Sequence, residues 1–198
     1  MLHPLIRFFF TDTQTHWAKT YIQTLKTQCN VFGYQDEDGN DLNIFKPDFK
    51  ISRYELITIV VRCKYGLNVS VATSSPFPDV KLDHWAVATV KKAYDEKIIT
   101  GYPDGTFKGD KTANRAEALA IMIRAFATPV QIEAAPVSAA CTDIDQNLWY
   151  ANIFNFAIDD KIIEGTKDKN GQLTGKCLPN SDITRAESAK VIIEASNK

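Results

Sequence analysis

Apolar side chains recur at helical spacing in six stretches of this sequence, and the six stretches fall into three pairs. In the first stretch of each pair, apolar residues follow one another after three or four positions, which is typical of an amphipathic helix with one buried face. These positions are Trp17, Tyr21 and Leu25, then Ala86, Val90 and Ala93, and finally Trp149, Ile153, Phe156 and Ala157. The pattern predicts three helices that each cover one side of a core.

The second stretch of each pair is apolar around most of its circumference. Its apolar positions are Leu56, Ile57, Ile59, Val60 and Val61, then Leu119, Ile121, Met122, Ile123 and Phe126, and finally Ala189, Val191, Ile192 and Ile193. A helix with this pattern contacts more than one neighbour. We therefore expect a mainly α-helical protein in which these helices form a central three-helix bundle and the other three surround it.

Short motifs show that the three pairs are copies of one unit. The copies open on Phe10-Thr11-Asp12, Phe77-Pro78-Asp79 and Cys141-Thr142-Asp143, which lie 67 and 64 residues apart, and each continues through a Trp, a Gly-centred turn and an x-Arg-x-Glu element. We place copies one, two and three at residues 1–70, 71–134 and 135–198, with loose linkers at 66–75 and 128–140. One copy cannot bury its apolar face alone, so we expect one compact pseudo-threefold body with three grooves.

The composition favours a protein with a sizeable core over a nucleic-acid or membrane protein. Hydrophobic residues make up 44% of the 198 residues, charged residues 24%, and the net charge is -1. Proteins that bind nucleic acid normally have a basic stripe, whereas Lys and Arg are scattered among acids here. No stretch approaches the roughly 20 apolar residues of a membrane span. Residues 5–10 are too short for a signal sequence and are interrupted by Arg7, so no targeting signal is expected.

The x-Arg-x-Glu element predicts the start of the second helix in each copy. Its first residue is Ser, Asn or Thr and a Glu follows three positions later, as in a capping box that satisfies two backbone N–H groups. The capping pairs are Ser52 with Glu55, Asn114 with Glu117, and Thr184 with Glu187.

Capping does not explain the arginines of the element, Arg53, Arg115 and Arg185. A cation in the first turn opposes the helix dipole and costs roughly 0.3–1 kcal/mol. In one interpretation, free N–H groups and the guanidinium together receive an external carboxylate or phosphate. In the other, the arginine forms an internal ion pair. The candidate internal acids are Asp12, Asp79 and Asp143.

The residues Trp17, Trp85 and Trp149 also have two interpretations. A Trp at the head of an amphipathic helix fills space in the core. A half-exposed Trp beside an Arg instead offers a flat face to a sugar ring, while the guanidinium binds a charged substituent, and this pairing selects an acidic carbohydrate. The segment from Gly101 to Gly105 is a tight turn, in which Tyr102 either borders a groove or covers its own core.

The motifs of this chain resemble those of the S-layer homology domain, in three consecutive copies over nearly the whole sequence. The resemblance rests on Phe77-Pro78-Asp79-Val80, Trp85-Ala86, Ile98-Ile99-Thr100-Gly101-Tyr102-Pro103-Asp104-Gly105-Thr106-Phe107 and Thr184-Arg185-Ala186-Glu187. It implies a monomeric, three-pronged pseudo-trimer on the bacterial cell surface that anchors proteins to a secondary cell-wall polysaccharide. In many members the ligand is a pyruvylated amino sugar held in grooves between repeats, and the arginine of the motif contacts it.

The residue pattern and the resemblance together give a set of expected ligand contacts. They are Arg115, Arg185, Arg53, Trp85, Trp149, Trp17, Gly101, Tyr102 and Asp79. Copy one departs from the motif at Tyr54 and in the enlarged loop 35–43, and copy three departs at Thr166 and in the loop 167–176, so Arg115 ranks first and Arg185 second. A function of another class stays open, in which the grooves dock protein neighbours in a surface lattice without binding glycan.

The four cysteines fall in copies one and three. Cys141 and Cys177 align with pairs of phenylalanines that are expected to touch, namely Phe10 with Phe45 and Phe77 with Phe107. We therefore expect a disulfide between Cys141 and Cys177, and another between Cys29 and Cys63, with free buried thiols as the alternative. Each bridge closes a loop of about 35 residues, which is worth about 3–4 kcal/mol. Disulfides favour a location outside the cytoplasm.

No motif predicts catalysis, a cofactor or a metal. His3, His16 and His84 lie near no repeated nucleophile, and the cysteines lack the C-x-x-C spacing of zinc sites. Loops 36–41 and 168–171 are acidic enough to suggest calcium, but they lack the first and twelfth ligands of an EF-hand loop, which favours solvated turns.

Overall fold

The computed structural model describes residues 9–198, and within them the fold is mainly α-helical. The described elements are the 3-10 helix η1 (Thr11–Thr13) and the helices α1 (Lys19–Gln28), α2 (Arg53–Tyr65), α3 (Val87–Asp95), α4 (Arg115–Phe126), α5 (Pro129–Ala134), α6 (Ala151–Asp159) and α7 (Arg185–Ser196). None of these helices is long and apolar enough to cross a membrane. The expectations for His3 and for most of the segment 5–10 fall outside the described residues.

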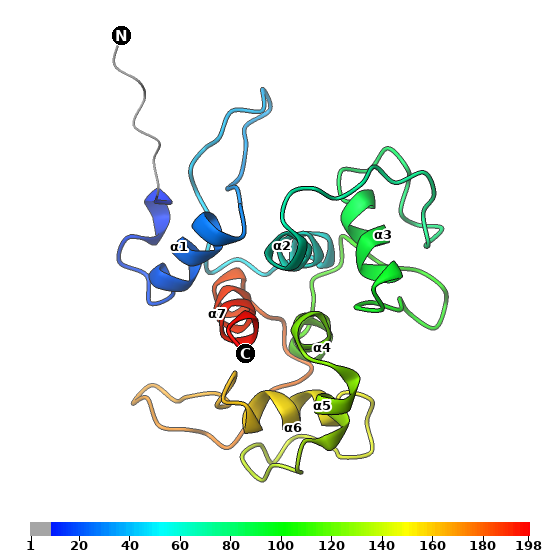
Figure 1. Ribbon diagram of the computed structural model, residues 1–198. Coiled ribbons are helices and arrows are strands. Elements are labelled where there is room, and N and C mark those ends of the chain that lie inside the picture. The colour runs from blue at the N-terminus through cyan, green and yellow to red at the C-terminus, as the bar shows by residue number, and fades with distance from the viewer. Residues whose placement is uncertain (1–8) are drawn as a thin grey trace.

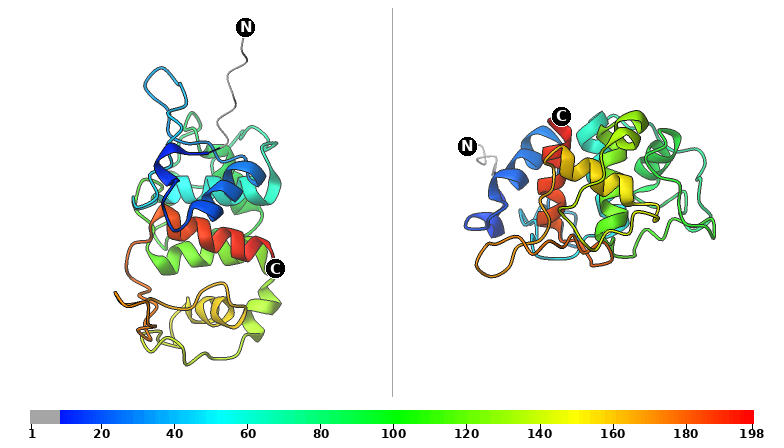
Figure 2. Two further views of the ribbon diagram at one scale, coloured as in Figure 1. Left: turned by 90° about the vertical axis from the view of Figure 1, so that its left-hand side faces the viewer. Right: turned by 90° about the horizontal axis from the view of Figure 1, so that it is seen from below.

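Helices α2, α4 and α7 lie together at the centre of the molecule and contact one another pairwise (Figure 1). The side view in Figure 2 shows α4 and α7 lying alongside each other. Ile57, Leu119 and Ile192 have at most 1% of their surface exposed, as expected for helices that are apolar on most sides. The sequence prediction that the second helix of each copy lies at the centre is therefore confirmed.

The outer helices interlock the copies. Helix α3 of copy two packs on α2 of copy one, and α6 of copy three packs on α4 of copy two. Helix α1 of copy one packs mainly on α7 of copy three, at the other end of the chain (Figure 1). Each copy thus covers the central helix of another copy, and the contacts return from the last copy to the first.

Loop segments join neighbouring copies through isolated β-bridges. Lys50 pairs with Thr184, Ser52 with Thr112, and Asn114 with Asp182, so each bridge links two different copies. Among residues 9–198, these and two bridges within the loops of copies one and three are the only β-pairings, and no sheet forms.

The aromatic and cysteine pairs occupy equivalent places. The rings of Phe10 and Phe45 lie 5.4 Å apart, and those of Phe77 and Phe107 lie 5.5 Å apart. In copy three, Cys141 and Cys177 form a disulfide at this position. A second disulfide joins Cys29, at the end of α1, to Cys63 in α2. Both predicted disulfides are confirmed, and the alternative of free thiols is wrong.

Two predictions about helix limits are wrong. Trp17 and Trp149 precede α1 and α6 and are exposed, so they do not lie on the buried helical faces. The segment 128–140 is not a loose linker throughout, because residues 129–134 form α5. Thr128 caps this helix, Ile132 is buried, and α5 packs against α6.

Tyr54, which replaces the small residue of the motif in copy one, is accommodated by a glycine. A Cβ atom on Gly109 would lie 2.1 Å from the Tyr54 ring, so only glycine leaves room for it. The ring also stacks on His84, with centroids 4.1 Å apart. Tyr54 therefore fills a junction between copies one and two.

Candidate functional site

The starts of the central helices are capped as the sequence predicts. In α2, the Ser52 side chain accepts a hydrogen bond from the backbone N–H of Glu55, and the Glu55 carboxylate accepts one from the N–H of Ser52. The same reciprocal pair forms between Asn114 and Glu117 in α4 and between Thr184 and Glu187 in α7. All three capping boxes are confirmed.

The next two N–H groups of each central helix donate to another copy. The N–H groups of Arg53 and Tyr54 donate to the carbonyls of Lys111 and Gly109, at 3.0 and 2.9 Å. At the other two helices the donors are Arg115, Ala116, Arg185 and Ala186, and the acceptors are Ser181, Pro179, Phe49 and Pro47. The prediction of free N–H groups at these helix starts is therefore wrong, because loop carbonyls of a neighbouring copy accept their hydrogen bonds.

Each motif arginine is bound to the copy that follows it. Arg53 donates from Nε to the carbonyl of Phe107 at 2.9 Å, lies 3.8 Å from Glu117, and packs over the rings of Tyr102 and Phe107. Arg53 is 6% exposed, and this burial lowers its pKa despite the nearby acids.

The other two motif arginines make equivalent contacts. Arg115 donates to the Cys177 carbonyl and pairs with Glu187 at 3.0 Å. Arg185 donates to the Phe45 carbonyl and pairs with Glu55 at 3.0 Å. The three ion pairs run from copy one to two, from two to three, and from three back to one.

The aspartates Asp12, Asp79 and Asp143 are not the acids that pair with the arginines. Asp79 accepts hydrogen bonds from the backbone N–H groups of Phe107 and Lys108 at 2.9 and 2.7 Å. Asp12 and Asp143 accept equivalent bonds from Phe45, Lys46, Cys177 and Leu178. In the described residues, the internal ion pairs instead use the glutamates of the capping boxes.

Three grooves lie beside these ion pairs, and each is built from all three copies. The Tyr102 groove, of about 430 Å³, combines Arg53 of copy one, Gly101, Tyr102 and Glu117 of copy two, and Trp149 of copy three. The Tyr34 groove combines Arg185, Gly33, Tyr34, Glu55 and Trp85. The Thr166 groove combines Arg115, Gly165, Thr166, Glu187 and Trp17.

This arrangement separates residues that belong to the motif of one copy. The motif of copy two ranks Arg115 first, but Gly101 and Tyr102 of that motif share a groove with Arg53. Arg115 lines the Thr166 groove with Trp17, whereas Trp85 lines the Tyr34 groove.

The three tryptophans are exposed at the groove walls. Trp17 is 59% exposed, Trp85 62% and Trp149 58%. The interpretation that they fill the core is therefore wrong. His16 and His84 hold the adjacent turns, because Nδ1 of each accepts a hydrogen bond from the N–H of Ala18 or Ala86. An exposed indole offers a flat apolar face with one N–H donor.

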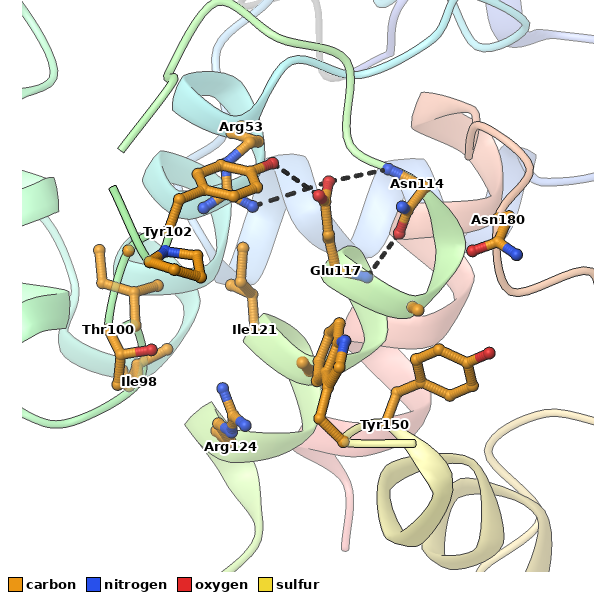
Figure 3. A pocket seen from close by; sticks show the side chains of 16 residues that line it. Arg53, Ile98, Thr100, Tyr102, Asn114, Glu117, Ile121, Arg124, Tyr150 and Asn180 are labelled. Carbon is orange, nitrogen blue, oxygen red and sulfur yellow. Dashed lines mark hydrogen bonds and ion pairs between the residues drawn. The ribbon is translucent and has the colours of Figure 1, made fainter. Parts of the chain in front are cut away.

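In the Tyr102 groove, Glu117 gathers three donors besides Arg53. The Tyr102 hydroxyl donates to one carboxylate oxygen and the Asn114 N–H to the other (Figure 3). The Lys111 ammonium donates to the same oxygen as Tyr102. Burial raises the pKa of Tyr102. Burial alone would also raise the pKa of Glu117, but the hydrogen bonds from Tyr102 and Lys111 outweigh it and the pKa is lowered.

The Tyr34 groove has the same core arrangement. The Tyr34 hydroxyl donates to Glu55 at 2.7 Å, and the Arg185 guanidinium packs over the Tyr34 ring. Burial raises the pKa of Tyr34 to about 12. In the Thr166 groove, Thr166 takes the place of the tyrosine. Its hydroxyl forms hydrogen bonds with the Thr174 hydroxyl and the Lys176 carbonyl.

Two arginines that are not among the expected ligand contacts also line grooves. Arg124 lines the Tyr102 groove and Arg62 lines the Tyr34 groove. Each follows the motif arginine of its own helix by nine residues, and this repetition was the available signal. This spacing is easily overlooked because both helices are mostly apolar.

Metal binding gains no support from the described residues, in which no three His, Cys, Asp or Glu side chains gather in a possible site. The loop at 36–41 is closed by its own hydrogen bonds, since Asp36 accepts from the backbone of Asp38 and from Asn40.

Comparison with known proteins identifies the family of copy two. Residues 76–119 match the family model of the S-layer homology domain. The chain contains an S-layer homology domain. The matched residues include the Gly101-Tyr102 turn, the capping box of α4 and Arg115.

Several proteins similar to this S-layer homology chain are named as cell-surface, S-layer or anchoring proteins. The chain is 31% identical over 168 residues to Cell surface glycoprotein 1 of Acetivibrio thermocellus, a match that covers 78% of this chain and 7% of the relative. It is 29% identical over 152 residues to the Cellulosome-anchoring protein of the same organism, covering 75% and 32%. It is 30% identical over 124 residues to the S-layer protein of Bacillus thuringiensis subsp. finitimus, covering 63% and 14%. The chain spans less than a third of the length of each of these relatives.

Proposed function

We propose that this chain is a non-catalytic module that anchors a protein to the bacterial cell wall outside the cell. Three S-layer homology repeats related by a pseudo-threefold axis would present three grooves to an acidic secondary cell-wall polysaccharide, such as one with pyruvylated amino sugars. Relatives named as S-layer and cellulosome-anchoring proteins support the anchoring part. The disulfides support a location outside the cytoplasm.

The observation that carries this proposal is the repeated composition of the grooves. Each groove joins a motif arginine, a hydroxyl-bearing residue after a glycine, and an exposed tryptophan, each from a different copy or helix. Exposed tryptophans form a face for sugar rings, and guanidinium groups bind planar carboxylates. Because each groove needs all three copies, polysaccharide binding would depend on the assembled body.

A sedimentation assay with cell-wall sacculi of the source organism tests the proposal. The purified chain should sediment with intact sacculi and stay in solution after the secondary polysaccharide has been chemically stripped. Equal binding to both preparations would contradict polysaccharide recognition and indicate peptidoglycan as the ligand.

A triple variant tests the role of the groove tryptophans in the same assay. Trp17→Ala, Trp85→Ala and Trp149→Ala together remove three exposed side chains, so the fold should persist while sedimentation is lost. Circular dichroism of the variant verifies the fold.

A lattice-docking function has one observation in its favour, namely that the motif arginines are already engaged in internal ion pairs. Under this alternative the chain would bind neither preparation of sacculi and would self-associate as its concentration rises. Analytical ultracentrifugation distinguishes the two functions.

A further inference from the structure

The Thr166 groove adjoins a second cavity. The groove has a volume of about 550 Å³ and the second cavity one of about 410 Å³. Each lies within the range of roughly 300–1,000 Å³ that is typical of small-ligand sites. Four residues line both spaces, namely Trp17, Arg115, Thr166 and Glu187. One exposed indole and one ion pair are therefore shared by two neighbouring spaces.

The ion pair of Arg115 and Glu187 lies between the two spaces. The groove follows α7 onward from Glu187 to Lys190 and Val191. The second cavity lies toward the start of α7, where Thr184 and the preceding loop line it. A chain that occupies the groove can therefore pass the ion pair and continue into the second cavity.

In the other two grooves, larger side chains cover the capping glutamate at this point. Tyr102 donates to Glu117, and the Lys111 ammonium donates both to Glu117 and to the Tyr102 hydroxyl. In the Tyr34 groove the Tyr34 hydroxyl donates to Glu55, and the Lys46 ammonium lies 4.1 Å from the centre of the Tyr34 ring. The tyrosine and the lysine together form a cover over the glutamate.

Both covering positions hold small residues in the Thr166 groove. Thr166 follows a glycine as Tyr102 does, and its hydroxyl bonds within its own loop. Ser181 is equivalent to Lys111, because the carbonyl of each accepts a hydrogen bond from the N–H of a motif arginine. The side chain of Glu187 is accordingly more exposed than its two counterparts. The loss of the cover at both positions leaves the passage between the two spaces open.

The second cavity has the polar lining that suits neutral sugar units. Ser181 and Thr184 contribute hydroxyl groups, and Asp48 and Lys50 of copy one lie opposite them in the chain order. Hydroxyl groups both donate and accept hydrogen bonds, as sugar hydroxyls do. Trp17 offers a flat apolar face to both spaces.

Resting on the proposed function above, we infer that the Thr166 groove binds the interior of a polysaccharide chain. A groove that is open past its ion pair lets a chain enter at one side and leave at the other, with consecutive sugar units along Trp17. A covered groove such as the Tyr34 groove accepts only a chain end. Thr166 and Ser181 are the residues that determine this specificity.

The test counts the protein molecules bound per chain of the secondary polysaccharide, after its release from sacculi and fractionation by length. Trp85→Ala with Trp149→Ala leaves the Thr166 groove with its tryptophan. The number of molecules of this variant per chain should rise in proportion to chain length, because a longer chain has more interior positions. Trp17→Ala with Trp149→Ala keeps the tryptophan of the Tyr34 groove and is the matched control, which should saturate at one molecule per chain at every length. Sedimentation velocity measures the stoichiometry.

Restoring the cover tests the two specificity residues. Thr166→Tyr and Ser181→Lys, added to the variant that keeps Trp17, should reduce the stoichiometry to one molecule per chain or abolish binding. Ser181→Lys alone changes an exposed side chain and should lower the stoichiometry even if the tyrosine disturbs its loop. Thermal unfolding verifies that each variant is folded.

Three outcomes would overturn the inference. The first is one molecule per chain at every length for the variant that keeps Trp17, and the second is no binding by that variant. The third is a stoichiometry that the restored cover leaves unchanged. The proposed anchoring function would survive all three, since it fails only if the wild-type chain does not sediment with intact sacculi.

Discussion

The Tyr102 and Thr166 grooves are built on the same frame but differ in what fills it. In both, a motif arginine binds a carbonyl and the capping glutamate of the next copy. In the Tyr102 groove the pair is covered by a tyrosine ring, with Glu117 only 11% exposed, whereas Glu187 in the Thr166 groove is 38% exposed. The arginine and glutamate therefore join the copies, while the variable positions determine how closed and how charged each groove is.

The largest expected difference between the two grooves is in the stability lost when the motif arginine is replaced by alanine. Arg53→Ala removes a buried guanidinium that packs over two rings and binds a carbonyl, so unfolding free energy should fall by about 3 kcal/mol. Arg115→Ala breaks a more exposed pair, and the loss should be about 1 kcal/mol. Urea unfolding of both variants checks the order. Equal losses would mean that the tyrosine cover adds nothing to the junction.

A smaller difference is expected at the glycines that open the two turns. Gly101 and Gly165 both have positive φ, so alanine is strained at either position. A Cβ on Gly101 would lie 2.4 Å from the Phe77 ring, whereas one on Gly165 would lie 3.0 Å from the Lys176 carbonyl oxygen. Gly101→Ala should therefore cost about 2 kcal/mol and Gly165→Ala about 1 kcal/mol. Melting temperatures in the same buffer test this, and a larger loss for Gly165→Ala would contradict the packing argument.

The smallest expected effect is a pH dependence of the stability that Glu117 contributes in the Tyr102 groove. The pKa of Glu117 is lowered from its ordinary value of 4.5. Its contribution to stability is therefore present above pH 4.5 and is lost as the pH falls through the lower, folded-state pKa. Glu117→Gln should be less stable than the wild type at neutral pH, and the gap should narrow on acidification. Urea titrations at several acidic pH values measure the gap, and a constant gap would exclude this role of the charge.

Much of the fold follows from local patterns in the sequence. Apolar periodicity is enough to place the central helices, because a helix such as α4 is apolar on nearly every side. Ser52 and Glu55 mark a helix start through chemistry that lies within four residues. Cys141 and Cys177 could be paired because two other copies place phenylalanines at the same positions.

The composition of the grooves could not be predicted in this way. Arg53 and Glu117 lie in different copies, and one copy of the motif gives no information about which neighbour it faces. The burial of Trp85 was ambiguous for a related reason, since an indole at a helix start suits either a core or a surface. From the sequence, the N–H of Arg53 is expected to be free. In the structure it donates to the loop carbonyl of Lys111, which belongs to the next copy.

The contact between α7 and α1 has a topological consequence. These helices belong to opposite ends of this sequence, and their copies are joined by packing, by the Arg185 to Glu55 ion pair and by the hydrogen bond from Tyr21 to Glu194. One junction of the closed circuit is therefore held without a covalent connection. A nick in the linker at 66–75 would create a second junction of the same kind, and the two fragments should remain associated as a split protein that reassembles from its parts.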